Sequence, residues 1–267
     1  MNRMERALRE LGEMDTLSEA DSPIHRLNPA AKLITVIAFI VTVLSFGKYD
    51  LRGLVPFILW PVLCYQLSGI PVRLCFYRMR FVLPLVMAVG LFNPLFDRQI
   101  VLRIGSAGIS GGTISMLCLM LKGVLCLMAS FLLVATTPFD SLCGALRKMH
   151  VPKTLVTLLL LTYRYVGVMT RELAVMTEAY ALRAPGQKGI HISAWGSFLG
   201  QFLLRSMDRA QELYASMLLR GYHHHFHYAP ETPFGRWDLV FLLGSIVLFL
   251  LFRRVDIAYL LGRLITG

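Results

Sequence analysis

Long stretches of apolar residues with almost no charged side chain dominate this sequence. Five such stretches occur, at residues 31–46, 54–70, 81–96, 112–135 and 239–252. A helix of about 20 apolar residues crosses the hydrocarbon core of a bilayer, and several of these stretches are somewhat shorter. We therefore expect an integral membrane protein with about five spans.

The composition of the chain favours lipid contact over burial in a soluble core. Apolar residues make up 56% of the 267 residues and charged residues only 16%, whereas a soluble domain has about 45–50% and about 25%. Backbone polar groups in hydrocarbon must pair within a helix or a closed barrel. The sequence shows no series of alternating ten-residue segments, so we predict an all-α polytopic membrane helix bundle.

The distribution of Lys and Arg predicts the orientation of the chain. With the N-terminus in the cytoplasm, nineteen of these residues lie on the cytoplasmic side and seven on the other side. Cytoplasmic loops carry such an excess of positive charge. Three of the seven, Arg253, Arg254 and Arg263, lie in the C-terminal tail, so the location of this tail stays open.

A segment of about one hundred residues separates the fourth and fifth spans. The chain therefore divides into a cytoplasmic N-terminal segment (1–30), spans one to four (31–136), a cytoplasmic helical region (137–237), and the last span with its tail (238–267). Within the cytoplasmic region we expect helices at 139–149, 153–183 and 194–220. Thr137 is the expected N-cap of the first helix, with Pro138 at its first position.

Both long helices of this region end on a similar tripeptide. These are Leu182-Arg183-Ala184 and Leu219-Arg220-Gly221, which we call the two arginine tips. A single Arg at a helix C-terminus can simply complement the helix dipole. Two such ends in one region favour a pair of docking sites, because a guanidinium binds carboxylates or carbonyls through two donors. Arg205 and Arg209, on the polar stripe of the third helix, are expected to matter less.

The remaining polar features give negative or open predictions. The sequence lacks a Gly-x-x-x-x-Gly-Lys-Ser/Thr loop, so we expect no nucleotide on this chain. Glycine-rich residues 108–112 are expected to form a loop. No nucleic-acid module accompanies the net charge of +11, which instead fits anionic lipid headgroups. Lys122, within the fourth span, is expected to pair inside the bundle or to extend toward the membrane surface.

One cluster of histidines follows the second arginine tip. His223, His224, His225 and His227 are candidate metal ligands, since imidazole binds divalent transition metals. A solvated loop with weak, adventitious binding is the favoured alternative. We expect no other metal site in this chain.

Several short motifs occur in a fixed order. Pro29 and Lys32 precede the first span, and the cytoplasmic region opens with Thr137-Pro138-Phe139-Asp140, Ala145-Leu146-Arg147-Lys148-Met149, Pro152-Lys153 and Thr162-Tyr163-Arg164-Tyr165. Together with the arginine tips, this order resembles the transmembrane (T) component of energy-coupling-factor (ECF) importers, in its CbiQ-like cobalt branch. In that family an acid and an arginine are usual where Asn28 and Ala30 stand, and alanine is usual in place of Leu182 and Leu219.

The resemblance implies a non-catalytic coupling subunit in the inner membrane of a bacterial cell. Two cytoplasmic ATPase subunits would hold ATP-Mg, with no cofactor on this chain, and each arginine tip would dock with one of them. A substrate-capturing membrane subunit of CbiM type would supply cobalt for cobalamin biosynthesis. A nickel or vitamin importer of the same type remains an alternative. The resemblance implies no nucleic-acid partner.

Two other classes of protein are alternatives to this interpretation. A secondary transporter needs polar binding groups near the middle of the bilayer and usually a repeated half, and the sequence shows neither. A membrane-bound hydrolase or transferase would need a catalytic constellation, and no carboxylates accompany the histidine cluster. ATP dependence of uptake tests the first alternative, and activity of the chain alone tests the second.

Overall fold

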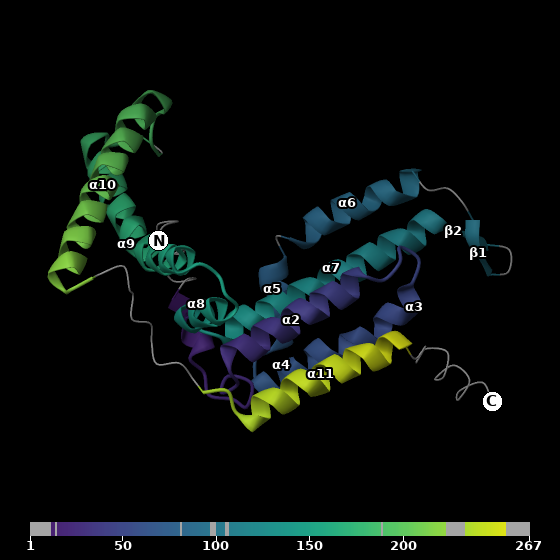
Figure 1. The fold of residues 1–267 in the computed structure, drawn as a ribbon. Helices are drawn as coiled ribbons and strands as arrows, with labels where there is room; N and C mark the ends of the chain where they lie inside the picture. The colour runs from purple at the N-terminus through teal and green to yellow at the C-terminus, as the bar shows by residue number, and fades with distance from the viewer. Residues whose placement is uncertain are drawn as a thin grey trace. The chain divides into compact units, whose positions relative to one another are not determined.

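A computed structural model describes residues 12–13, 15–80, 82–96, 100–104, 107–187, 189–222 and 233–254. These residues form two compact units, one built from the apolar helices and the other from the helices between Phe139 and Leu219 (Figure 1). The structure is predominantly helical, which confirms the predicted fold class. A short β-hairpin, which the sequence pattern did not indicate, is also present.

The first apolar helix, α2 (Pro29–Leu44), begins at a strong start signal. The side chain of Asn28 accepts a hydrogen bond from the Ala30 N–H over 3.0 Å, and Pro29 occupies the first turn, where its missing N–H costs nothing. Phe39 and Val43 are fully buried against the other apolar helices. One face of α2 thus forms the core, while Val41 and Leu44 on the outside are exposed, as expected for a face toward lipid.

The second apolar stretch is interrupted by a change of helix type. It consists of α3 (Leu51–Leu54), the 3₁₀-helix η1 (Val55–Ile58) and α4 (Leu59–Ser68). Pro56 lies in the first turn of η1, and a proline removes a donor from the helical ladder. Gly69 ends α4 with a positive φ of 70°, a conformation that glycine adopts without strain.

The third apolar stretch is a pair of helices with a bend. α5 (Val72–Met79) and α6 (Leu83–Phe96) meet at 60°. Beyond α6, strands β1 (Ile100–Ile104) and β2 (Ala107–Ser110) pair antiparallel. The predicted loop at 108–112 is therefore wrong, because the β-branched residues of 100–104 and Ile109 favour a paired, extended backbone.

The longest apolar helix, α7 (Gly111–Thr136), lies at the centre of the first unit. It packs closely on α6 at Gly123, where an added Cβ would come within 2.9 Å of Val86. Small residues allow such close approach of helices in membranes. The hydroxyl of Tyr65, in α4, donates to the Met128 carbonyl of α7 over 3.0 Å. Buried polar groups in this unit thus find partners on neighbouring helices.

The last apolar helix, α11 (Arg236–Arg254), joins the bundle through aromatic contacts. Phe249 packs on Phe39 and Trp60, with ring centroids 5.3 and 5.4 Å apart. The indole N–H of Trp60 also donates to Ser245 Oγ over 3.2 Å. Aromatic pairs at these separations add to the energy of apolar burial, so the first and last apolar helices of the sequence share one core.

Most of the described residues in the five predicted apolar stretches lie in helices. By length and hydropathy, two helical stretches among the described residues are suited to cross a membrane, Leu51–Ser68 and Gly111–Thr136. The bent pair α5–α6 makes a third if it forms one span, and Pro29–Leu44 is a shorter apolar helix. The protein is thus a helical membrane protein.

The second unit contains α8 (Phe139–Lys148), α9 (Lys153–Arg183), the 3₁₀-turn η2 (Ile192–Ala194) and α10 (Trp195–Leu219). These bounds agree closely with the predicted helices. The predicted cap by Thr137 is wrong, because its buried hydroxyl has no hydrogen-bond partner in the part of the chain that the structure describes. Thr137 lies one residue outside the position from which an N-cap reaches α8.

Helix α8 is fixed on α9 by three kinds of contact. The rings of Phe139 and Tyr163 stack with centroids 4.2 Å apart. Asp140 accepts a hydrogen bond from Arg164 over 3.1 Å. Cys143 packs with two apolar residues of α9, and burial raises the pKa of its thiol, which makes it unreactive. Helix α8 is thereby packed against the N-terminal half of α9.

Candidate functional site

The two arginine tips lie at ends of long helices, as predicted. Arg183 is the last residue of α9, and the N–H of Ala184 still donates to Tyr180 O over 3.0 Å. Arg220 caps α10, and the N–H of Gly221 donates to Leu218 O over 2.9 Å. Gly221 has a φ of 80°, the left-handed conformation common just after a helix.

Each arginine follows a leucine that is almost completely exposed. Leu182 is 84% exposed and Leu219 is 90% exposed. Covering a leucine side chain contributes roughly 1.5–3 kcal/mol, so an uncovered one at a helix end is a ready contact for a partner. The tips therefore offer the same pair of side chains twice, one apolar and one cationic.

Although Arg220 occupies the C-cap position of α10 through its backbone, neither tip guanidinium holds a helix end within the described part of the chain. No hydrogen bond or ion pair of the Arg183 or Arg220 guanidinium is found there. Both side chains are exposed. A cation in the last turn of a helix complements the helix dipole without a hydrogen bond, and its exposed donors are at the same time available to a partner. Docking of the tips therefore stays a prediction.

The two tips are separated by the length of α10. The C-terminal half of α9 and the N-terminal half of α10 line one cavity, and the other two halves line a second, so the two helices run antiparallel. Arg183 therefore lies beside the start of α10, and Arg220 lies at its end. The 25 residues of α10 correspond to roughly 37 Å, which is enough for each tip to meet a different partner.

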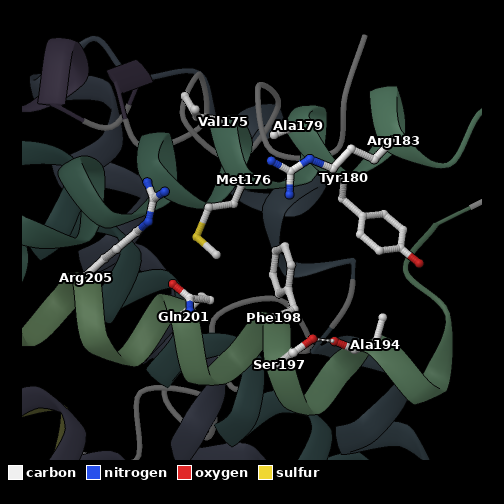
Figure 2. A pocket seen from close by; sticks show the side chains of 10 residues that line it. All are labelled: Val175, Met176, Ala179, Tyr180, Arg183, Ala194, Ser197, Phe198, Gln201 and Arg205. Carbon is white, nitrogen blue, oxygen red and sulfur yellow. Dashed lines mark hydrogen bonds between the residues drawn. The ribbon is translucent and has the colours of Figure 1, made fainter.

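A cavity of about 380 Å³ lies next to Arg183. Figure 2 shows Met176 of α9 pointing toward Phe198 and Gln201 of α10, with Arg183 and Arg205 at either side. A second cavity, of about 400 Å³, is more apolar and is lined by residues that include Leu158, Leu213 and Tyr214. Side chains thus meet only loosely between α9 and α10, which leaves much apolar surface of α10 exposed.

Two arginines of α10 differ from the tip arginines because each has an acidic partner. Arg205 of α10 forms an ion pair with Glu172 of α9, and Arg209 pairs with Glu212 within α10 over 3.0 Å. Arg205 was expected to be a residue of the polar surface stripe, and its contact with α9 was not predicted. No pattern in the sequence could have identified it, because the partners lie 33 residues apart.

Two further candidates have different outcomes. The histidine cluster His223, His224, His225 and His227 lies outside the described residues, and among the described residues no group of three or more His, Cys, Asp or Glu is suited to a metal. Lys122 pairs inside the bundle. Its ammonium donates to the Phe46 carbonyl just beyond α2, over 2.6 Å.

The structure thus combines a helical membrane unit with a second unit that presents two exposed arginine tips. Comparison with known proteins gives the family: a family described as CbiQ, cobalt transport protein, matches residues 20–228. The chain belongs to this family. The match confirms the resemblance found in the sequence, and it includes Lys32 and both arginine tips.

Three relatives carry informative names. The energy-coupling factor transporter transmembrane protein EcfT of Lactococcus lactis is 26% identical over 76% of this chain and 81% of its own length. The nickel permease LarQ of Lactiplantibacillus plantarum is 29% identical over 44% of this chain and 43% of its own. The cobalt transport protein CbiQ of Rhodobacter capsulatus is 33% identical over 34% of this chain. The match thus covers less than half of the length of these two relatives, 43% of LarQ and 37% of CbiQ.

Proposed function

We propose that this chain is the membrane-embedded coupling subunit of an ATP-driven ECF-type importer for a transition-metal ion. The observation that carries this proposal is the pair of exposed Leu-Arg tips, one at the end of α9 beside the start of α10 and the other at the end of α10. Two equivalent, widely separated tips suit two equivalent partners. The membership in a transport family and the likeness to EcfT support the same conclusion.

The partners of the tips are two cytoplasmic ATPase subunits, and a membrane subunit of CbiM type captures the substrate. Each subunit would receive one arginine in an acidic or carbonyl-lined groove, with the neighbouring leucine covered by apolar surface. The excess of Lys and Arg between the fourth and fifth apolar stretches supports a cytoplasmic position of the tips. The chain would cross the inner membrane of a bacterial cell several times.

The chain itself is proposed to be non-catalytic and to carry no cofactor. ATP-Mg belongs to the ATPase subunits, since this sequence has no phosphate-binding loop. Movement of the ATPase subunits during hydrolysis would shift the tips, and α9 and α10 would pass this shift to the membrane subunit that holds the metal.

Cobalt for cobalamin synthesis is the favoured substrate because the matching family is described as cobalt transport. Nickel is the second candidate, supported by the likeness to a nickel permease. The metal is chosen by the capturing subunit, so the same coupling chain suits either ion. A vitamin importer of ECF type is a further alternative.

Reconstitution of the chain with its genetic neighbours tests the proposal. The purified complex is placed in liposomes, and ATP is supplied on the side of the membrane where the ATPase subunits lie. Radioactive Co²⁺ or Ni²⁺ is added on the other side, and its uptake is measured. The proposal predicts uptake that requires ATP and all subunits, with preference for Co²⁺. Uptake by this chain alone, driven by an ion gradient without ATP, would contradict it.

A further inference from the structure

Two oppositely charged residues are buried together where α2 begins. Lys32 is 4% exposed and Asp238, in the first turn of α11, is 6% exposed. The charge of Asp238 acts on the Lys32 ammonium. Burial of a charge is costly unless hydrogen bonds and an opposite charge compensate it, so the contacts of these two side chains show what they hold together.

Lys32 holds the end of α7. Its ammonium donates to the carbonyl of Thr136, the last residue of α7, over 2.7 Å, and to the carbonyl of His25 over 3.2 Å. The last carbonyls of a helix have no partner within the helix and carry partial negative charge. Thr136 is also the point at which the chain leaves the first unit, because α8 begins three residues later.

Asp238 holds the returning connection. One of its carboxylate oxygens accepts from the Gly235 N–H and the other from the Asn28 N–H, each over 2.7 Å. Gly235 precedes α11, where the chain has come back from the second unit. A carboxylate at a helix N-terminus is favourable, and this one also ties α11 to the residue that caps α2.

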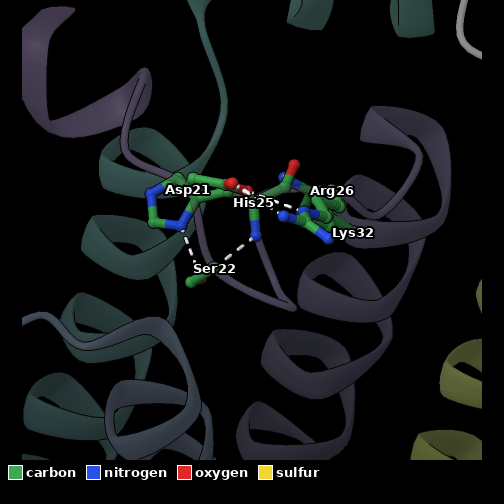
Figure 3. A network of polar contacts seen from close by, with 5 residues as sticks. All are labelled: Asp21, Ser22, His25, Arg26 and Lys32. Carbon is green, nitrogen blue, oxygen red and sulfur yellow. Dashed lines mark hydrogen bonds and ion pairs between the residues drawn. The ribbon is translucent and has the colours of Figure 1, made fainter.

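The loop before α2 keeps the second carbonyl partner of Lys32 in place. Figure 3 shows Asp21, Ser22, His25 and Arg26 of this loop together with Lys32. Ser22 Oγ and His25 Nδ1 share a hydrogen bond over 2.7 Å, and the other ring nitrogen of His25 contacts Leu17 O at 3.1 Å. Arg26 pairs with Asp21 at 2.7 Å, and this hydrogen bond lowers the pKa of the Asp21 carboxyl.

We propose that Lys32 and Asp238 form a polar clamp that fixes both connections of the coupling helices, at Thr136 and at Gly235, to the start of α2. Movement of α9 and α10 is then passed to both attachment points together instead of to each one independently. The inference rests on the proposed coupling function. Lys32 and Asp238 are positioning residues: they contact neither ATP nor the metal.

The test measures how many Co²⁺ ions the reconstituted complex takes up for each ATP hydrolysed. Lys32→Met removes the ammonium but keeps the chain length, and Asp238→Asn removes the charge but keeps the shape. We expect both variants to assemble and to hydrolyse ATP, while uptake per ATP falls about tenfold, the effect of losing a charged hydrogen bond from the coupled state. Lys32→Arg, which keeps the charge and the donors, should retain most of the coupling.

Lys122→Met is the matched control. Lys122 also donates to a backbone carbonyl, that of Phe46, but at the other end of α2, away from both connections. We expect its uptake per ATP to equal that of the parent. A loss as large as that of Lys32→Met would show that any lysine in this bundle matters equally, and it would overturn the inference.

The remaining outcomes also decide. If Lys32→Met assembles and couples like the parent, while Arg183→Ala does not, the clamp is wrong and the proposed function stands. If Lys32→Met does not assemble, the other two variants decide. Parental coupling in Asp238→Asn then overturns the clamp. Reduced coupling in Asp238→Asn, together with near-parental coupling in Lys32→Arg, supports the clamp. A parent complex without ATP-dependent uptake would instead refute the proposed function.

Discussion

Arg205 of α10 and Glu172 of α9 form an ion pair that joins the two long helices of the second unit. Arg205 also lines the cavity beside Arg183. Because side chains meet only loosely elsewhere between these helices, this pair helps to set how α10 lies along α9. Because α9 ends in one arginine tip and α10 in the other, the pair also helps to fix the two tips relative to each other.

Charge reversal tests this connection. Both side chains are partly exposed, and pairs of this kind contribute less than about 1 kcal/mol to stability. Arg205→Ala should therefore lower the thermal unfolding midpoint only slightly. Arg205→Glu places two carboxylates together and should reduce ATP-dependent uptake, and the double variant Arg205→Glu/Glu172→Arg should restore it. A double variant no better than Arg205→Glu would show that the pair has no role in coupling.

Thr137→Val is expected to stabilise the protein. The buried hydroxyl of Thr137 lacks a partner among the described residues, and leaving such a group unsatisfied costs about 1–3 kcal/mol. Valine has nearly the same shape, so the unfolding midpoint should rise. The adjacent Thr136 is the control, since its hydroxyl donates to Leu132 O over 2.8 Å. Thr136→Val should give no such rise, and an equal rise in both variants would contradict the explanation.

The helices could be predicted where their causes are local. Pro152 before α9 and Ala184-Pro185-Gly186 after it predict both ends of that helix. The first span was expected to begin at residue 31, and the cap by Asn28 that starts α2 at Pro29 was not predicted. The β-hairpin was missed because the glycines near residue 110 suggested a loop, while the pairing depends on residues on both sides of the turn.

The contacts that join distant parts of the chain could not be predicted. Lys32 and Thr136 are 104 residues apart, and Asn28 and Asp238 are 210 apart. Nothing in a single sequence shows which carbonyl a lysine will reach. The arginine tips were predictable as helix ends. The exposure of Leu182 and Leu219, and the lack of partners for the two guanidiniums among the described residues, follow only from the folded unit.

The histidine cluster should be dispensable for transport. A metal ion that is imported is captured from outside by another subunit, whereas His223 follows closely after the second tip in the sequence. Replacing His223, His224, His225 and His227 by Ala should leave Co²⁺ uptake near the parental rate. Loss of uptake in a fully assembled complex would show that the cluster takes part in transport.

The isolated chain should neither bind nor hydrolyse nucleotide. The sequence contains no phosphate-binding loop, and the ATPase activity is assigned to partner subunits. Equilibrium dialysis of the purified chain with labelled ATP and Mg²⁺ should therefore show no binding at micromolar concentration. Micromolar binding that survives purification in a second detergent would contradict the assignment of a purely coupling role.

The two arginine tips carry the central claim. Docking would bury each guanidinium beside polar groups of an ATPase subunit, and truncating one partner of such a pair costs roughly 2–5 kcal/mol. Arg183→Ala or Arg220→Ala should weaken assembly or uncouple hydrolysis from uptake, and the double change should be worse. Arg→Lys at either tip should rescue only in part, because the two-donor geometry is lost.

The most direct measurement is the affinity of the ATPase subunits for the detergent-purified chain carrying Arg183→Ala, Arg220→Ala or both. Arg209→Ala is the matched control, because Arg209 is an exposed arginine of α10 whose partner, Glu212, lies on the same helix. We predict a loss of affinity of at least about thirtyfold for each tip variant and parental affinity for Arg209→Ala. Parental affinity and parental ATP-dependent uptake in the double variant Arg183→Ala/Arg220→Ala would contradict the coupling function itself.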